Sequence, residues 1–254
     1  MRFASLGSGS EGNGLVVESG GTCVLIDCGF GVRNTAARLA RLGLAPSSLT
    51  AILVTHEHSD HVGGVPAFAA RHGIPVWATF GTLAAVSVRF EGMTHVYGFD
   101  SHDRFAIDAL EIMPFAVPHD AREPVQYVIG DGMRRLGVLT DLGVSTVHVE
   151  ASLSGCDALV LECNHDVDML ANGDYPYPLK QRIAGRLGHL SNEAAAEILE
   201  QIDTSRLTHI IAAHLSQQNN TPELARWALA AALGCRPDWI GIADQANGFD
   251  WREI

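Results

Sequence analysis

Four side chains that can bind a metal ion lie close together in the stretch "THEHSDH" at 55–61. These are His56, His58, Asp60 and His61, and the stretch directly follows the apolar run "AILV". Imidazole and carboxylate groups are common ligands of zinc and of other divalent transition metals. A solvated polar loop after a strand is the structural alternative, but it gives no reason for so many ligand types together. The stretch therefore predicts a metal site, although not a zincin helix, because HExxH requires a second histidine where Asp60 stands.

Two of these histidines are two positions apart. If the strand predicted at 50–55 continues through His56 and His58, both side chains project from the same face, as two ligands of one ion require. Asp60 and His61 would then lie in the turn that enters the next helix.

Further ligands are expected at the ends of other strands. A catalytic zinc keeps one coordination position open for water, and a two-metal site takes about six or seven protein ligands. Three residues follow predicted strands in this way: His119, Asp141 and His214. Any one of them could be a hydrogen-bonded loop residue, but three such placements together favour a metal centre.

The elements that must position these ligands alternate between strands and helices, with a strand-rich middle. Strands are assigned to short β-rich runs between Gly and Ser turns, and helices to stretches with apolar residues at helical spacing. The predicted strands are 2–7, 14–19, 22–28, 50–55, 76–78, 94–99, 104–108, 110–117, 125–130, 134–140, 157–163 and 208–213. The predicted helices are 32–44, 64–72, one from Thr82, 144–151, 191–201 and 222–233. This order predicts an α/β fold with helices on both outer faces of two packed sheets, in one domain over 1–254.

Composition and charge narrow the class of protein. The chain has 254 residues and a formal charge of -12, which argues against a protein that coats nucleic acid but leaves room for a local anion site. The five cysteines are odd in number and form no CxxC pair, so neither a disulfide framework nor a cysteine zinc site is indicated. No apolar run approaches the roughly 20 residues of a membrane helix, and no signal peptide is evident, so we expect a cytoplasmic protein.

Several motifs together resemble a known family. The pattern of "THEHSDH", a later His, "TDLG" and "AAHLS" resembles the metallo-β-lactamase fold superfamily, with its four-layer αββα sandwich. Within it the chain is similar to the YycJ/WalJ/VicX group, a branch near the RNase Z and PhnP-type phosphodiesterases. The motifs that carry this second resemblance are "GSGSEGN", "DCGFG", "VPHDAREPV", "LECNHD", "GHLSN" and "HLSQQNN". Two positions depart from the pattern, Cys163 and Gln126, and neither departure removes a ligand.

The resemblance implies a set of roles for the candidate ligands. It implies that His56, His58 and His119 hold one divalent ion. It implies that Asp60, His61 and His214 hold a second, with Asp141 bridging the two. Zinc is the first expectation for both ions, with manganese or iron as alternatives. A hydroxide between the ions would be the nucleophile, Asp60 would orient it, and Asp27 would be the buried structural aspartate of the fold.

The stretch 175–192 bears on the choice of substrate. It contains Lys180, Arg182, Arg186 and His189 but no acidic residue, although the chain is strongly acidic. We expect Lys180 and Arg182 to bind an anionic substrate there, the alternative being a solvated helix face followed by a turn.

The same resemblance implies that His189, paired with Glu162, assists departure of the leaving oxygen as a general acid. Glu162 at a strand end could instead cap a loop. His165 has the same two interpretations, and Cys163 could tune the site or only line it.

The function predicted from these features is a dinuclear metal-dependent phosphodiesterase, and more narrowly a DNA exonuclease-like nuclease. Its substrate would be nucleic acid or a small phosphodiester. One alternative on the same fold is a hydrolase of carbonyl substrates such as β-lactams, lactones or thioesters. The other is a non-catalytic regulatory protein whose metals are structural.

Overall fold

Two mixed sheets of seven strands each form the centre of the computed structural model, which describes residues 1–254. The first sheet has the order β14 (Phe249–Glu253), β1 (Arg2–Gly7), β2 (Gly14–Ser19), β3 (Thr22–Ile26), β4 (Ala51–Leu53), β5 (Val76–Thr79) and β6 (Val96–Phe99). The second has the order β13 (Gly241–Ile242), β12 (His209–Ala213), β11 (Ala158–Glu162), β10 (Arg135–Leu139), β9 (Val125–Gly130), β8 (Leu110–Ala116) and β7 (Phe105–Ile107).

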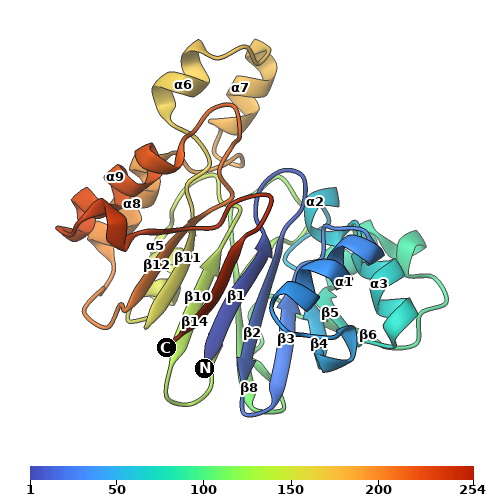
Figure 1. Cartoon of the computed structure of the whole chain (residues 1–254). Coiled ribbons are helices and arrows are strands. Elements are labelled where there is room, and N and C mark those ends of the chain that lie inside the picture. Colours follow the sequence, from blue (N-terminus) through green and yellow to red (C-terminus); the bar gives the residue numbers. More distant parts are fainter.

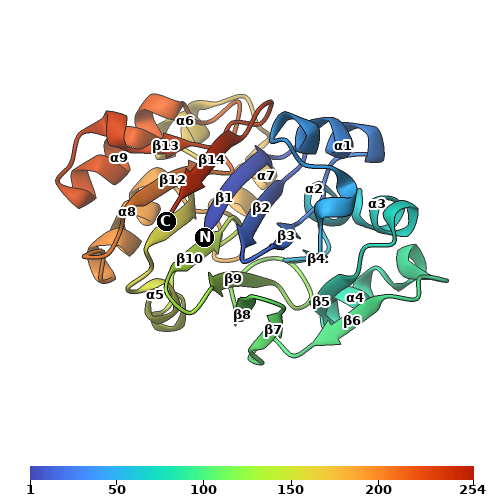
Figure 2. The same ribbon diagram turned by 60° about the horizontal axis from the view of Figure 1, so that its bottom comes forward.

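Helices cover the outer face of each sheet (Figure 1). Those beside the first sheet are α1 (Val32–Arg41), α2 (Ser59–Val62), α3 (Val65–His72) and α4 (Phe80–Ala85). Those that follow the second sheet's strands are α5 (Val147–Leu153), α6 (Val167–Asn172), α7 (Tyr177–Ile183), α8 (Asn192–Gln201) and α9 (Pro222–Leu233). The αββα arrangement predicted from the sequence is therefore confirmed, and Figure 2 shows the layers from a second side. No helix combines the length and apolar character that crossing a bilayer requires.

Three apolar clusters explain why the layers stay together. One cluster of 22 buried residues lies between the sheets and draws on both of them. The other two, of 22 and 21 residues, lie under the helices on the outer faces. Alternate residues of one strand serve different layers: Phe3 belongs to the central cluster, whereas Ala4 and Leu6 belong to an outer one. Both faces of each sheet are buried, which accounts for the nearly continuous apolar strands of the sequence.

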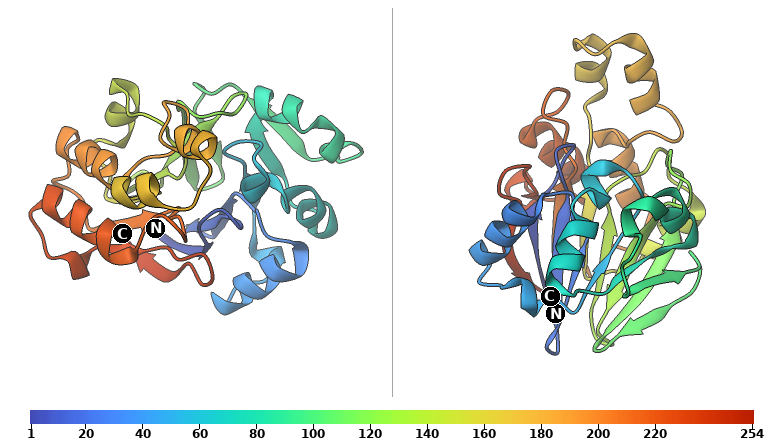
Figure 3. Two further views of the ribbon diagram at one scale, coloured as in Figure 1. Left: turned by 90° about the horizontal axis from the view of Figure 1, so that it is seen from above. Right: turned by 90° about the vertical axis from the view of Figure 1, so that its right-hand side faces the viewer.

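Strand direction brings the candidate ligands to one edge. Strands β3 and β4 are parallel, and so are β10, β11 and β12. Strand β8 also runs with β10, because both pair antiparallel with β9. Residues that follow these strands therefore lie at the carboxyl edge of the sheets. Helices α6 and α7 project beyond that edge as an arm, visible at the top of Figure 1 and in Figure 3.

Five elements were not predicted from the sequence, and the bounds of others differ from the prediction. Strands β13 and β14 were not predicted, and β14 has an exposed, charged pattern that gives little strand signal. The short helices α2, α6 and α7 were also missed, since four to seven residues show little helical periodicity. The helix predicted from Thr82 begins at Phe80, where Thr79 caps its amino end. The helix predicted at 144–151 begins at Val147, after its Thr146 cap.

One hydrogen bond joins the two sheets immediately before the histidine-rich loop. The hydroxyl of Tyr127, on β9, donates to the carbonyl of Val54 over 2.6 Å, and the tyrosine is completely buried. We predict that Tyr127→Phe lowers the free energy of unfolding by about 1 to 2 kcal/mol, because a buried carbonyl loses its donor. Chemical denaturation measures this change. Tyr97→Phe, which removes a hydroxyl from an exposed side chain on β6, is the control, and equal midpoints for the two variants would contradict the prediction.

Candidate metal centre

The histidine-rich loop leaves the sheet earlier than the sequence predicts. Strand β4 ends at Leu53, before the end of the strand predicted at 50–55, so the condition that the strand continues through His56 and His58 is not met. The cause is Thr55, whose backbone N–H donates to the carboxylate of Asp27 over 2.8 Å and not to a neighbouring strand. A turn of the loop, and not strand alternation, brings the two imidazoles together, with ring centroids 4.6 Å apart.

The buried carboxylate of Asp27 organises this loop. Its Oδ1 accepts the Thr55 N–H, and its Oδ2 accepts the Thr55 hydroxyl at 2.8 Å and Nδ1–H of His61 at 2.7 Å. Asp27 itself has a φ of 58°, in the left-handed region that costs free energy for residues other than glycine. Because Nδ1 of His61 is occupied, its Nε2 is left to face the other ligands.

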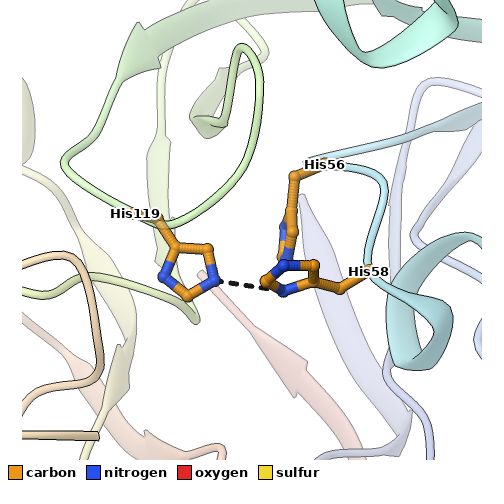
Figure 4. Close-up of side chains that lie close together, drawn as sticks. All are labelled: His56, His58 and His119. Carbon is orange, nitrogen blue, oxygen red and sulfur yellow. Dashed lines mark hydrogen bonds between the residues drawn. The ribbon is translucent and has the colours of Figure 1, made fainter. Parts of the chain in front are cut away.

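The first group of ligands consists of His56, His58 and His119, whose available nitrogens lie within 4.8 Å of one another. Figure 4 shows the three rings converging from the loop after β4 and the loop after β8. Nδ1 of His119 donates to the Gly188 carbonyl over 3.0 Å, and its Nε2 lies 3.3 Å from Nδ1 of His58. Nε2 of His56 is buried without a hydrogen-bond partner. A metal ion would supply the partner that this nitrogen lacks.

The second group consists of Asp60, His61 and His214, whose ligand atoms also lie within 4.8 Å of one another. Oδ2 of Asp60 lies 3.3 Å from Nε2 of His61 and 3.4 Å from Nε2 of His214. Asp60 and His61 lie in α2 and not in a turn before the next helix. The helix presents both side chains to the loop that follows β12.

Asp141 lies between the two groups. One carboxylate oxygen is 3.1 Å from Nε2 of His61, and the other is 3.8 Å from Nε2 of both His119 and His214. No donor is aligned for a hydrogen bond to its buried Oδ2. His56, His61 and Asp141 also form a close group of their own. This position matches the bridging role that the family resemblance implies.

The site concentrates charge in a buried place. Burial disfavours the charged form of His214, but Asp141, Asp60 and Glu162 outweigh it and raise the pKa of His214 to about 10. Burial, reinforced by His61, holds the pKa of His56 well below its usual value. Burial opposes ionisation of Asp141 too, but His214 and His61 hold the pKa of this carboxyl well below its usual range. Buried carboxylates beside imidazole groups are a donor set that fits divalent metal ions, whose charge would replace the ring protons.

Glu162 makes both kinds of contact that the sequence left open. Its Oε2 accepts the backbone N–H groups of Leu142 at 2.8 Å and Leu190 at 3.1 Å, so it does cap loops. Its Oε1 accepts Nδ1–H of His189 at 2.7 Å. Burial opposes protonation of His189, but Glu162 prevails and raises the pKa of this imidazole. With Nδ1 held by Glu162, Nε2 is the free nitrogen of His189.

A cleft of about 380 Å³ opens over these groups, and Asp60, Asp141, His189 and His214 are part of its lining. A larger cavity of about 600 Å³ beside Leu233 and Trp239 contains none of the candidate ligands, so size alone does not identify the site.

The two predicted substrate-binding residues have different positions. Arg182 lines the cleft, and its Nε donates to Oδ2 of Asp120 over 2.7 Å. Lys180 is not part of the lining, and its Nζ donates to the Ala171 carbonyl over 2.7 Å. Cys163 and His165 are buried outside the cleft lining. The nearby thiol of Cys163 therefore belongs to the core under α8.

Three residues near the ligands were missed by the sequence analysis. Asn13 donates from Nδ2 to Oδ2 of Asp60 at 3.2 Å, and Asn164 donates to the His214 carbonyl at 3.0 Å. The backbone carbonyl of Asp120 accepts Nε2–H of His58 at 3.2 Å. All three lie inside the motifs "GSGSEGN", "LECNHD" and "VPHDAREPV", so their sequence signal was adjacency to a recognised motif.

Comparison with known proteins gives matches over nearly the whole chain. A family model described as a beta-lactamase superfamily domain matches residues 22–210. The exodeoxyribonuclease YycJ of Bacillus anthracis is 35% identical, over 98% of this chain and 96% of that protein. The exodeoxyribonuclease WalJ of Streptococcus pneumoniae is 32% identical, over 95% of this chain and 91% of that protein. Among solved structures, the metallo-beta-lactamase fold protein YhfI of Bacillus subtilis has a TM-score of 0.76 at 17% identity, covering 99% of each chain.

We predict that Asp27→Asn weakens metal binding by about 10- to 100-fold, because the amide no longer accepts strongly from His61 and Thr55. Competition with a chromogenic zinc chelator measures the affinity. Asp238→Asn, at an exposed ion pair with Arg236, is the control for loss of a carboxylate. An unchanged zinc affinity in folded Asp27→Asn protein would refute this account of the loop.

Proposed function

Because the chain belongs to the beta-lactamase superfamily, we propose that it is a dinuclear metal-dependent phosphodiesterase that acts as an exonuclease on DNA. The observation that carries the proposal is the hydrogen bond between Glu162 and His189, because His189 lines the same cleft as His58 of the first ligand group and as Asp60 and His214 of the second. The two relatives are named exodeoxyribonucleases, which supports the choice of DNA among phosphodiesters. A cytoplasmic location remains part of the proposal.

The seven candidate ligands support two ions. We propose that His56, His58 and His119 hold one and that the second group, Asp60, His61 and His214, holds the other, with Asp141 between them. Zinc is the first choice because imidazole nitrogens dominate the set, and manganese or iron are the alternatives. When bound, such ions would polarise the phosphate and lower the pKa of the attacking water.

Side chains of the protein would orient the attacking water, protonate the leaving group and attract the substrate. Asp60 lines the cleft and can accept a hydrogen bond from the attacking water, which orients it. Glu162 fixes the ring of His189 through Nδ1, so the Nε2–H of the protonated ring can be donated to the leaving oxygen. An alkoxide leaving group needs such a proton. Arg182, which lines the cleft, can attract the negative charge of the substrate.

The alternatives make different demands on these residues. A hydrolase of β-lactams, lactones or thioesters would use the same ligands, but it would have little need of the ion-paired His189. A regulatory protein with structural metals would be expected to close its coordination sites with protein ligands. Here the ligand groups border an open cleft, which supports an enzyme.

We predict that His189→Ala reduces cleavage of end-labelled DNA by about 10²- to 10⁴-fold while metal content stays the same. The rate of bis(p-nitrophenyl) phosphate cleavage should fall much less, because nitrophenolate departs without protonation. The measurements are steady-state rates on both substrates together with metal analysis of each variant. His148→Ala, on the outer helix α5, is the matched histidine control.

Two results would contradict the proposal. One is equal loss on both substrates with metal intact, which would remove the acid role of His189. The other is turnover of a β-lactam or thioester, without any phosphodiester cleavage, at a rate that His189→Ala leaves unchanged.

A further inference from the structure

Helix α7 turns one face toward the cleft and not toward the core. Leu179, Arg182 and Ile183 line the cleft, and their spacing of three and four residues places them on one side of the helix. None of the residues of α7 is buried. The apolar side chains of a surface helix normally pack against the core. In α7 they instead border a polar site that anions and metals would favour.

Tyr175 extends this apolar face. It lies two residues before the start of α7, it lines the cleft, and it is half-buried. An aromatic ring at the border of a polar site can stack against a flat partner while its hydroxyl stays in water. Together, Tyr175, Leu179 and Ile183 form what we term the arm wall.

Other parts of the cleft lining have a different character. Ser10, from the glycine-rich loop after β1, and Ser59, at the start of α2, contribute hydroxyl groups there. Asp60, Asp141 and His214 line the same cleft. A molecule that fits must therefore combine an apolar, flat part with an anionic, hydrogen-bonding part.

The arm is tied to the ligand loop by one ion pair. Arg182 binds Asp120, and Oδ1 of Asp120 lies 3.5 Å from ring nitrogens of His58 and His119. The exposed fraction of the Arg182 side chain is 59%, so this contact is made at the cleft mouth. It fixes the arm wall at a set distance from the first ligand group.

The size of the cleft limits what can enter. A volume of about 380 Å³ is near the lower end of the roughly 300 to 1,000 Å³ typical of small-molecule sites. A cleft of this size suits one nucleotide better than a stacked base pair.

We propose that the arm wall binds the base of one terminal nucleotide. This base unstacks from the rest of its strand and stacks on the ring of Tyr175. This inference rests on the proposed function and names its substrate: a free DNA end whose last nucleotide is unpaired. Base stacking on an aromatic side chain is tolerant of sequence, since every base has a flat face. Cleavage should therefore depend on the presence of a terminal base more than on its identity.

The test compares ordinary single-stranded DNA with DNA whose terminal nucleotide is abasic, at each end in turn. Tyr175→Ala should lower kcat/KM on ordinary DNA by about 10- to 100-fold, through KM, and on the abasic end by less than about twofold. Tyr175→Phe should restore the rate, because the ring and not the hydroxyl does the stacking. Tyr177→Ala, at a tyrosine that is 70% exposed and outside the cleft lining, is the control.

Each other outcome decides against the inference. Equal losses on ordinary and abasic ends, or no loss at all, would overturn the base site while leaving phosphodiester cleavage intact. Cleavage of closed circular single-stranded DNA as fast as linear DNA would overturn the requirement for an end. If the wild-type protein cleaved neither DNA nor bis(p-nitrophenyl) phosphate with zinc, manganese or iron, the proposed function would fail, and the base site with it.

Discussion

A single buried carboxylate, that of Asp27, determines the geometry on which the whole site depends. It takes the backbone N–H of Thr55 away from the sheet, and so β4 stops before the histidine-rich loop. The same carboxylate binds Nδ1 of His61 and leaves the other nitrogen for a metal ion. Because Asp27 ends a strand in the middle of a buried sheet, it cannot move without disturbing the central core.

This constraint lets a stable sandwich support an unfavourable concentration of charge. Parallel strands deliver Asp141, Glu162 and His214 from one sheet, while the loop held by Asp27 supplies His56 and His61 from the other. Buried carboxylates and imidazoles so close together are costly unless cations or protons compensate them. The fold thus keeps these groups at the end of the sheets, where they border a cleft and can exchange with solvent species.

Much of this arrangement could be predicted from the sequence, for identifiable reasons. The strands were predictable because both faces of each sheet are buried and their apolar runs are nearly continuous. The ligands were predictable because they follow those strands. The early end of strand β4 was not predictable, since Asp27 acts on Thr55 across 28 positions of sequence. The arm was missed for a different reason: α6 and α7 are short and pack little against the core, so no periodic pattern marks them.

The central claim is that two groups of ligands, joined by Asp141, make one phosphodiesterase centre. Its most direct test is titration of the metal-free protein with zinc, following bound metal per chain and cleavage of end-labelled DNA in the same samples. We predict that activity stays low until one ion is bound and reaches its full value only with two. Full activity with a single ion per chain, or activity in the metal-free protein, would contradict the account.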